Sequence, residues 1–191
     1  IVGCKKDKPE IKDLFSITLN PVKQSGDTLF LEWNSVNTPF FKSYLIYRAT
    51  GLIGSTPYVI PPDKNHTKFT DIDIAPKQEI SYRVAALLTT GDTIFSNTQF
   101  VKSDSLMVDL LPLTTYNDSV KLNWSVNYKH QPGVVTLTRK AEGRETELIK
   151  LHNLAITTYT DKNIPYTTEI SYKITAEVIY DPKKSESNTQ S

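Results

Sequence analysis

The sequence predicts an all-β protein built from two tandem β-sandwiches of about seven strands each. The first observation behind this is a phrase that occurs twice, "EISYRVAA" at 79–86 and "EISYKITA" at 169–176. The second is that apolar and polar residues alternate within short runs, which is typical of strands with one buried face. The third is that no segment carries a sustained helical stripe of apolar residues. Together they indicate two copies of one β-domain.

The register between the copies extends well beyond the quoted phrase. The offset is 91 residues at the tryptophans and 90 at the phrase, and the changes fall in segments rich in Gly, Pro, Asp and Asn, which mark turns. Insertions and deletions confined to turns are expected of repeated domains. The further matching segments are "DTLFLEW" (27–33) with "DSVKLNW" (118–124), "TKFTD" (67–71) with "TTYTD" (157–161), and "SNTQ" at 96–99 and at 187–190.

Alternation places the strands in order along each copy. In "LFLEW" the residues Leu29, Leu31 and Trp33 share one face, and in "ISYRVAA" Ile80 and Tyr82 begin another inward face. We expect further strands, eight to fifteen residues apart, at 44–48, 58–60, 68–72 and 94–101.

The expected domain limits follow from the repeat. We place the first domain at 11–102 and the second at 105–191, after a tether at 1–10. Ser191 aligns with Phe100, in the middle of a strand, so we expect the last strand of the second domain to be truncated in this sequence.

These residues resemble fibronectin type III domains over nearly the whole chain. The resemblance rests on a tryptophan late in the second strand, "YLIYR" in the third, "T-x-[FY]-T-D" entering the fifth and "Y-[RK]-[VI]-x-A" in the sixth. It implies seven-stranded, immunoglobulin-like sandwiches with Trp33 and Trp124 between the sheets. The tyrosine corner of that family falls on Ile80 and Ile170, which marks these copies as divergent members.

Charge and motifs argue against most chemistries. With 22 basic and 21 acidic residues the net charge is +1, which gives no field that would attract nucleic acid. His66, His130 and His152 lie in different segments and belong to no catalytic or metal-binding motif. Asp71 and Asp161 repeat, and we interpret them as turn residues. We therefore predict that the protein is not an enzyme and holds no cofactor or metal.

The start of the sequence carries a different signal. "IVGC" followed by "KKDKPE" resembles the lipobox of bacterial lipoproteins, and Cys4 is the only cysteine. The resemblance implies that a signal peptide precedes these residues, that Cys4 is lipidated, and that the protein is anchored in the outer membrane on its periplasmic or cell-surface side. Acyl chains contribute about 0.8 kcal/mol per buried methylene, so several chains hold a protein stably.

Four short segments suggest modification. "DTL", "DTI", "DSL" and "DSV" resemble the Asp-Ser/Thr-aliphatic acceptor of O-glycosylation in Bacteroidota-type bacteria, which implies glycans on Thr28, Thr93, Ser105 and Ser119. The alternative is structural, because Asp followed by Ser or Thr is common turn chemistry just before a strand.

Three functional readings remain open. We favour an accessory or protein-binding subunit of an outer-membrane or surface complex, whose partner is another envelope protein. Its candidate contact is the loop "NTPFFK" (37–42), with Phe40 exposed and Phe41 in the core. The second reading is a carbohydrate-binding protein, with a platform of Tyr128, His130 and Tyr180. The third is the accessory part of a larger secreted enzyme.

Overall fold

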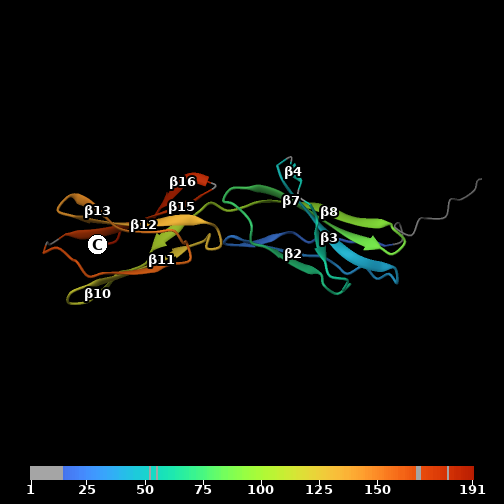
Figure 1. The fold of residues 1–191 in the computed structure, drawn as a ribbon, viewed down its shortest axis with the longest axis horizontal. Coiled ribbons are helices and arrows are strands. Elements are labelled where there is room, and N and C mark those ends of the chain that lie inside the picture. Colours follow the sequence, from blue (N-terminus) through green and yellow to red (C-terminus); the bar gives the residue numbers. More distant parts are fainter. Residues whose placement is uncertain (1–14, 52, 55, 167–168, 180) are drawn as a thin grey trace, which may run out of the picture. The chain divides into compact units, whose positions relative to one another are not determined.

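The computed structural model describes residues 15–191 except 52, 55, 167–168 and 180. Every regular element in this part of the chain is a β-strand, which confirms the all-β prediction (Figure 1). The described residues form two compact units: residues 15–23 with 29–71 and 79–102, and residues 24–28 with 72–78 and 103–191. The described residues contain no helix long and apolar enough to cross a membrane.

Copy one folds as two antiparallel sheets. A three-stranded sheet has the order β1-β2-β6, and a larger sheet has the order β4-β3-β7-β8, with β5 also paired to β3. The strands are β1 (Lys23–Ser25), β2 (Thr28–Glu32), β3 (Phe41–Thr50), β4 (Ile53–Gly54), β5 (Tyr58–Ile60), β6 (Lys68–Asp71), β7 (Glu79–Leu88) and β8 (Thr93–Lys102).

Copy two repeats this arrangement. One sheet has the order β10-β11-β14 with β9 also paired to β11, and the other has the order β13-β12-β15-β16. The sheets have three and five strands in copy one and four and four strands in copy two, so each copy has eight described strands where about seven were predicted. Two such antiparallel sheets form the predicted fibronectin type III-like, immunoglobulin-like sandwich. The strands are β9 (Val108–Leu110), β10 (Thr114–Thr115), β11 (Val120–Val126), β12 (Gly133–Ala141), β13 (Arg144–Leu151), β14 (Thr158–Asp161), β15 (Ile170–Val178) and β16 (Asp181–Glu186).

The predicted tryptophans lie in the two cores. Trp33 and Trp124 are each only 2% exposed. In copy one the Trp33 ring meets Tyr44 edge to face, with ring centres 5.4 Å apart. In copy two Val135 is fully buried at the position that aligns with Tyr44. The cores therefore match in position and differ in how they are filled.

The repeated aspartates are structural, but they are buried at strand ends, so their interpretation as turn residues is incomplete. Asp161 does accept a turn bond, from Asn163 N to its Oδ1 at 3.1 Å. Asp71 ends β6 and is buried, and its Oδ2 lies 2.9 Å from Arg48 Nε. Tyr82 Oη donates a hydrogen bond to the same oxygen. A buried carboxylate needs such partners, because an unpaired charge in a core is very costly.

Copy two contains the same buried group of three side chains. Arg139 Nη1 lies 2.6 Å from Asp161 Oδ2, and Tyr172 Oη donates to that oxygen at 3.0 Å. In each copy the arginine stands directly opposite the tyrosine on the neighbouring strand. The repeated "T-D" and "ISY" segments thus encode a structural Asp-Arg-Tyr group.

The second repeated phrase, "SNTQ", ties the last strand to the start of each sandwich. The Asn97 side chain accepts a bond from Leu19 N at 2.9 Å and donates to Leu19 O at 3.1 Å. In copy two Leu110 N donates to Asn188 Oδ1 at 2.9 Å. Ser96 Oγ likewise accepts the Val84 amide. Both repeated phrases therefore build the scaffold, and functional differences must lie where the copies diverge.

Candidate functional site

The copies differ in residue character on the outer face of the β3–β7–β8 sheet of copy one. Side chains alternate across a strand, so the buried Tyr44 and Ile46 leave Leu45 and Tyr47 pointing outward. On β7 the buried Tyr82 and Val84 leave Ser81 and Arg83 pointing outward. Strand register sets Tyr47 opposite Arg83, Leu45 opposite Ala85, Ala85 opposite Phe95, and Ser81 opposite Phe100. We call this surface the copy-one face: Leu45, Tyr47, Ala49, Ser81, Arg83, Phe95, Thr98 and Phe100. Ala85, which stands between Leu45 and Phe95 in the register, is fully buried and is not part of it.

The copy-one face presents large apolar side chains to solvent. Phe95 is 43% exposed and Phe100 is 81% exposed, and the neighbouring Val59 on β5 is 68% exposed. The rings of Tyr47 and Phe95 lie side by side with centres 5.8 Å apart. Contiguous exposed apolar surface on a folded domain marks interaction sites more often than single apolar residues do.

The same positions of copy two are polar. Thr138 replaces Tyr47, and Glu186 replaces Phe95. Because both copies have the same strand order and the same buried group, the fold itself does not require apolar residues here. The full set of replacements is Leu45 by Thr136, Tyr47 by Thr138, Ala49 by Lys140, Arg83 by Lys173 and Phe95 by Glu186.

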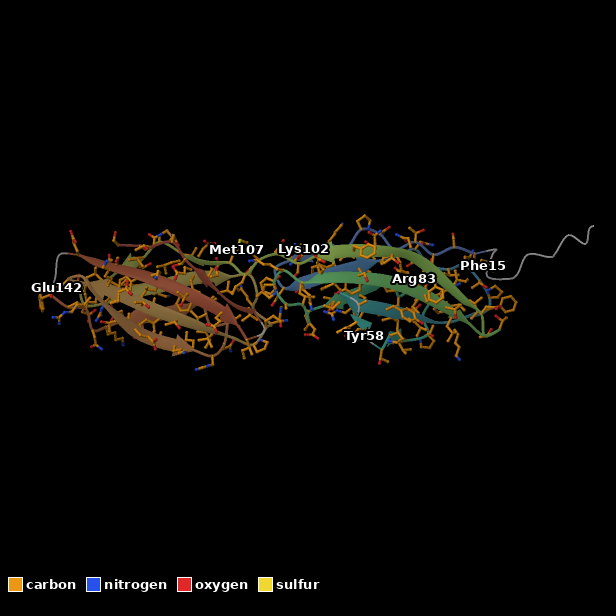
Figure 2. All side chains as sticks on the ribbon, turned by 90° about the horizontal axis from the view of Figure 1, so that it is seen from above. Phe15, Tyr58, Arg83, Lys102, Met107 and Glu142 are labelled. Atoms are coloured by element: carbon orange, nitrogen blue, oxygen red, sulfur yellow. The ribbon has the colours of Figure 1, made fainter. Side chains whose placement is uncertain are left out.

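Arg83 is the charged residue within the copy-one face (Figure 2). Its guanidinium carbon lies 4.1 Å from the centre of the Phe95 ring, within the range of a cation–π interaction. Its Nε donates to the carbonyl oxygen of Ser96 at 3.2 Å. Within the described part of the chain it has no ion-pair partner, whereas Lys173 of copy two lies 3.6 Å from Glu186.

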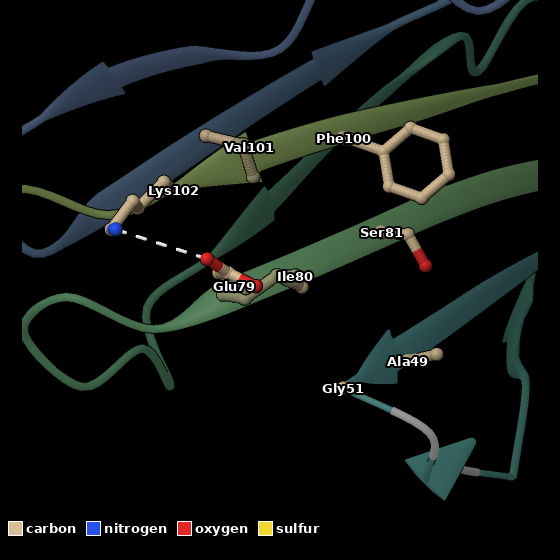
Figure 3. Close-up of a pocket in the computed structure, with 8 residues that line it drawn as sticks. All are labelled: Ala49, Gly51, Glu79, Ile80, Ser81, Phe100, Val101 and Lys102. Carbon is tan, nitrogen blue, oxygen red and sulfur yellow. Dashed lines mark ion pairs between the residues drawn. The ribbon is translucent and has the colours of Figure 1, made fainter.

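A shallow pocket opens beside Phe100 (Figure 3). It has a volume of about 320 Å³, and its lining includes the small side chains of Ala49 and Ser81. The ion pair of Lys102 and Glu79, with 3.8 Å between its atoms, is also part of the lining. A second hollow of about 260 Å³ shares Ala49 and Ser81 and extends to Tyr47 and Arg83. The copy-one face is therefore grooved as well as apolar.

Phe40 and Phe41, the loop residues predicted as contacts, differ in their exposure to solvent. Phe40 is 39% exposed. Phe41 opens β3 and is half-buried, and its ring centre lies 4.7 Å from that of Tyr44. Phe40 is thus exposed as predicted, whereas Phe41 is half-buried rather than part of the core.

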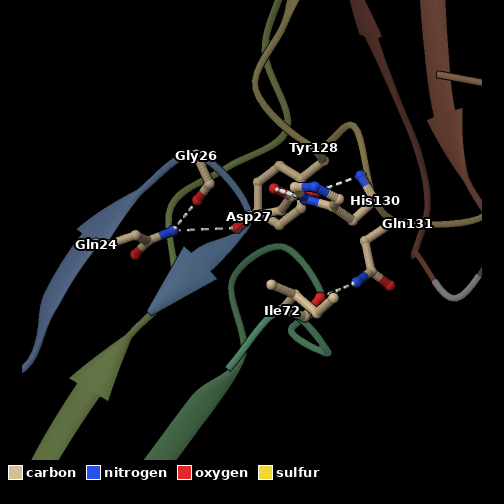
Figure 4. Close-up of polar contacts among 7 residues, drawn as sticks. All are labelled: Gln24, Gly26, Asp27, Ile72, Tyr128, His130 and Gln131. Carbon is tan, nitrogen blue, oxygen red and sulfur yellow. Dashed lines mark hydrogen bonds and ion pairs between the residues drawn. The ribbon is translucent and has the colours of Figure 1, made fainter. Parts of the chain in front are cut away.

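The predicted carbohydrate platform is wrong for Tyr128. This residue is fully buried in the second unit, and Gln24 Nε2 donates to its hydroxyl at 3.5 Å (Figure 4). The hydroxyl in turn donates to the Asp104 carbonyl at 2.7 Å. Burial raises the pKa of the Tyr128 phenol. A buried ring has no face for stacking on a sugar, which removes the centre of the platform. Tyr180 lies outside the described residues.

His130 is partly exposed but already engaged within the second unit. Its Nδ1 lies 2.8 Å from Asp27 Oδ1, and its backbone N–H donates to the other carboxylate oxygen. Close by, Gln131 Nε2 donates to the Ile72 carbonyl at 2.9 Å. Gly26, with φ of 58°, has no room for a side chain, because a Cβ would lie 2.5 Å from the Asn127 carbonyl oxygen. These contacts give the segment around His130 a structural role.

The candidate modification sites lie near strand starts. Thr28 opens β2 and Thr93 opens β8, Ser119 precedes β11, and Ser105 is exposed ahead of β9. Asp27, the aspartate of the Thr28 motif, is buried. Cys4 lies outside the described residues. Within the described part, no group of three His, Cys, Asp or Glu side chains could hold a metal ion.

Sequence reasoning did not single out Arg83, Phe95 or Phe100. A signal for them was present in the repeat alignment, where apolar residues of copy one stand against Thr, Lys and Glu of copy two. Comparing the outward positions of the copies would have found them.

No protein-family model matches the chain, and no curated protein sequence matches it. Solved structures with a similar fold over part of the chain include the following two. The pectate lyase Pel3 from Pectobacterium carotovorum aligns at TM-score 0.40 and 14% identity over 48% of this chain and 28% of that chain. The FN1–FN3 domains of chicken CNTN1 align at TM-score 0.35 and 16% identity over 92% of this chain and 64% of that chain. The chain spans less than two thirds of either protein, and at these TM-scores neither similarity carries an argument about its function.

Proposed function

We propose that this protein is a non-enzymatic binding module of the bacterial cell envelope, and that it docks onto another envelope protein through the copy-one face. The observation that carries the proposal is the contrast between the copies. One fold holds Tyr47, Phe95 and Phe100 outward in copy one, and polar residues at those positions in copy two.

The composition of the face supports a protein partner. Tyr, Phe and Arg are enriched at the centres of protein interfaces, whereas Lys and Glu are depleted there. Covering a ring such as that of Phe100 contributes about 1.5–3 kcal/mol, so a few such residues suffice for specific docking.

The test uses exposed phenylalanines on the two sheets of copy one. Full-length protein with its natural leader is cross-linked on native membranes, as wild type, Phe100→Ser, Phe95→Ser and Phe30→Ser. Phe30 is 44% exposed on β2, outside the copy-one face, and so serves as the matched control. We expect a specific partner to be lost about tenfold or more with the first two variants and kept with Phe30→Ser. Equal recovery with all variants would reject the copy-one face as the docking site.

The proposal includes anchoring through a lipid on Cys4, at the outer membrane. The basis is the "IVGC" motif followed by a polar tether. Expressed with its leader in a bacterium of the Bacteroidota type, the protein should partition into detergent and carry acyl mass on Cys4. A Cys4→Ala variant that stays equally membrane-bound would reject this anchor.

O-glycosylation of Thr28, Thr93, Ser105 and Ser119 is part of the same proposal. Ser105 is the most accessible of the four, whereas the buried Asp27 makes the Thr28 motif the least accessible. Glycopeptide mass spectrometry of the native protein should therefore show higher occupancy at Ser105 than at Thr28.

A further inference from the structure

We infer that Arg83 is a receptor for a carboxylate of the docking partner, so that the partner presents an Asp or Glu side chain surrounded by apolar side chains. This inference rests on the proposed docking function and specifies the chemistry of its partner.

Copy two shows what the scaffold does with a cation at this position. Lys173 aligns with Arg83, and Glu186 on the neighbouring strand supplies a carboxylate 3.6 Å away. In copy one the position of Glu186 is taken by Phe95, which offers a ring face and no acceptor for an ion pair. Copy two thus supplies the carboxylate for its own cation, whereas in copy one the carboxylate has to come from another molecule.

The guanidinium is positioned for that task before any partner arrives. Stacking on Phe95 and the bond from Nε to the Ser96 carbonyl hold its plane over the sheet. The bond to Ser96 uses only Nε. The edge formed by Nη1 and Nη2 can therefore bind a carboxylate through two parallel hydrogen bonds. Because less side-chain freedom is lost on binding, a fixed arginine binds more tightly than a mobile one.

The surroundings favour a protein over a sugar. Recognition of a sugar relies on several convergent polar groups, and the copy-one face offers Ser81 and Thr98 as its hydroxyls besides Tyr47, with no Asp, Asn, Glu or Gln among its residues. The neighbouring Leu45, Tyr47 and Phe95 instead match apolar side chains of a polypeptide.

Charge also argues against a second copy of this chain as the occupant. A symmetric contact centred on the copy-one face would bring two Arg83 guanidinium groups together, and like charges in a closed interface are strongly unfavourable. A carboxylate from a different protein removes this repulsion and forms the ion pair.

The experiment selects binders from a randomised peptide display library with the full-length protein. The selected peptides are then measured against Arg83→Gln, Arg83→Lys and Phe95→Glu. The last variant gives Arg83 an internal carboxylate, as in copy two. We expect Asp or Glu beside apolar residues in the selected peptides, with at least tenfold weaker binding to Arg83→Gln and to Phe95→Glu. Arg83→Lys should keep part of the affinity, because it preserves the charge and loses the two-bond geometry.

The outcomes separate this inference from the proposed function. Peptides without acidic residues that bind Arg83→Gln as well as wild type, yet are lost with Phe100→Ser, would overturn the carboxylate receptor and leave docking intact. A library that yields no peptide dependent on Phe95 or Phe100 would count against both. Tight binding of heparin that depends on Arg83, or dimerisation abolished by Arg83→Gln, would show that a sugar or a second copy is the occupant instead.

Discussion

The guanidinium carbon of Arg83 lies 4.1 Å from the centre of the Phe95 ring, at a position where copy two pairs Lys173 with Glu186. Two residues thus change a self-contained ion pair into a stacked cation that is open to a partner. Neither change touches the buried Asp-Arg-Tyr group or the "SNTQ" tether. The two copies therefore share one scaffold, and the docking that we propose is assigned to copy one alone.

The buried carboxylates should be essential for stability. Asp161→Asn keeps the side-chain volume and removes the charge that pairs with Arg139, whose side chain is only 13% exposed. We expect a loss of about 3–5 kcal/mol in the free energy of unfolding, the usual effect of breaking a buried ion pair. Asp71→Asn should have a similar effect on copy one. Chemical denaturation measures both, with the exposed Asp109→Asn as the control; a loss no larger than that of the control would contradict the assignment.

Stability should fall at high pH because of two tyrosines. Burial raises the pKa of Tyr82 and of Tyr172 above the usual 10.0, and the neighbouring Asp71 and Asp161 raise it further. Above pH 10 the unfolded chain therefore releases protons that the folded chain retains, which favours unfolding. Each tyrosine contributes a decrease of up to about 1.4 kcal/mol per pH unit.

The measurement is the free energy of unfolding between pH 8 and 11.5. Stability should be flat with respect to these two groups below pH 10 and should decrease above it. Tyr172→Phe and Tyr82→Phe should each reduce the slope, whereas Tyr116→Phe, at an exposed residue, should leave it unchanged. If all three variants show the same slope as the wild type, other groups cause the loss of stability at high pH.

The strands and cores were predictable because they depend on local alternation. A buried face on a strand requires an apolar residue at every second position, so Trp33 and Trp124 could be assigned to the core without coordinates. The burial of Tyr128 could not be predicted in this way. Its hydroxyl is hydrogen-bonded to groups distant in sequence, Gln24 and Asp104, and no local pattern predicts such contacts.

The copy-one face was hidden for a related reason. An outward strand position tolerates almost any residue, so Phe95 and Phe100 look like ordinary alternation when a strand is read alone. They can be recognised as one surface only from the register of β7 and β8, which places them on the same face as Arg83.

The "SNTQ" tether gives a third prediction. Asn97→Ala removes two hydrogen bonds to the Leu19 backbone and should cost about 1–3 kcal/mol of stability. Thr98→Ala changes the next residue, which is exposed, and should cost less than about 0.5 kcal/mol. Denaturation midpoints of the two variants test this directly. Equal midpoints would mean that water replaces the tether without loss.

The neighbouring phenylalanines Phe40 and Phe41 allow docking to be separated from stability. Phe41→Ser removes a half-buried ring that packs on Tyr44, and we expect a loss of about 1–3 kcal/mol. Phe40→Ser removes an exposed ring, while its backbone still donates to Thr38 Oγ1 and still accepts the Thr89 amide. The loop should therefore keep its shape, and stability should change by less than about 0.5 kcal/mol.

If Phe40 also contacts the envelope partner, cross-linking on native membranes should decrease for Phe40→Ser in spite of its unchanged stability. A stable Phe40→Ser variant that cross-links as wild type does would confine docking to the copy-one face, and a large loss of stability would make Phe40 part of the core.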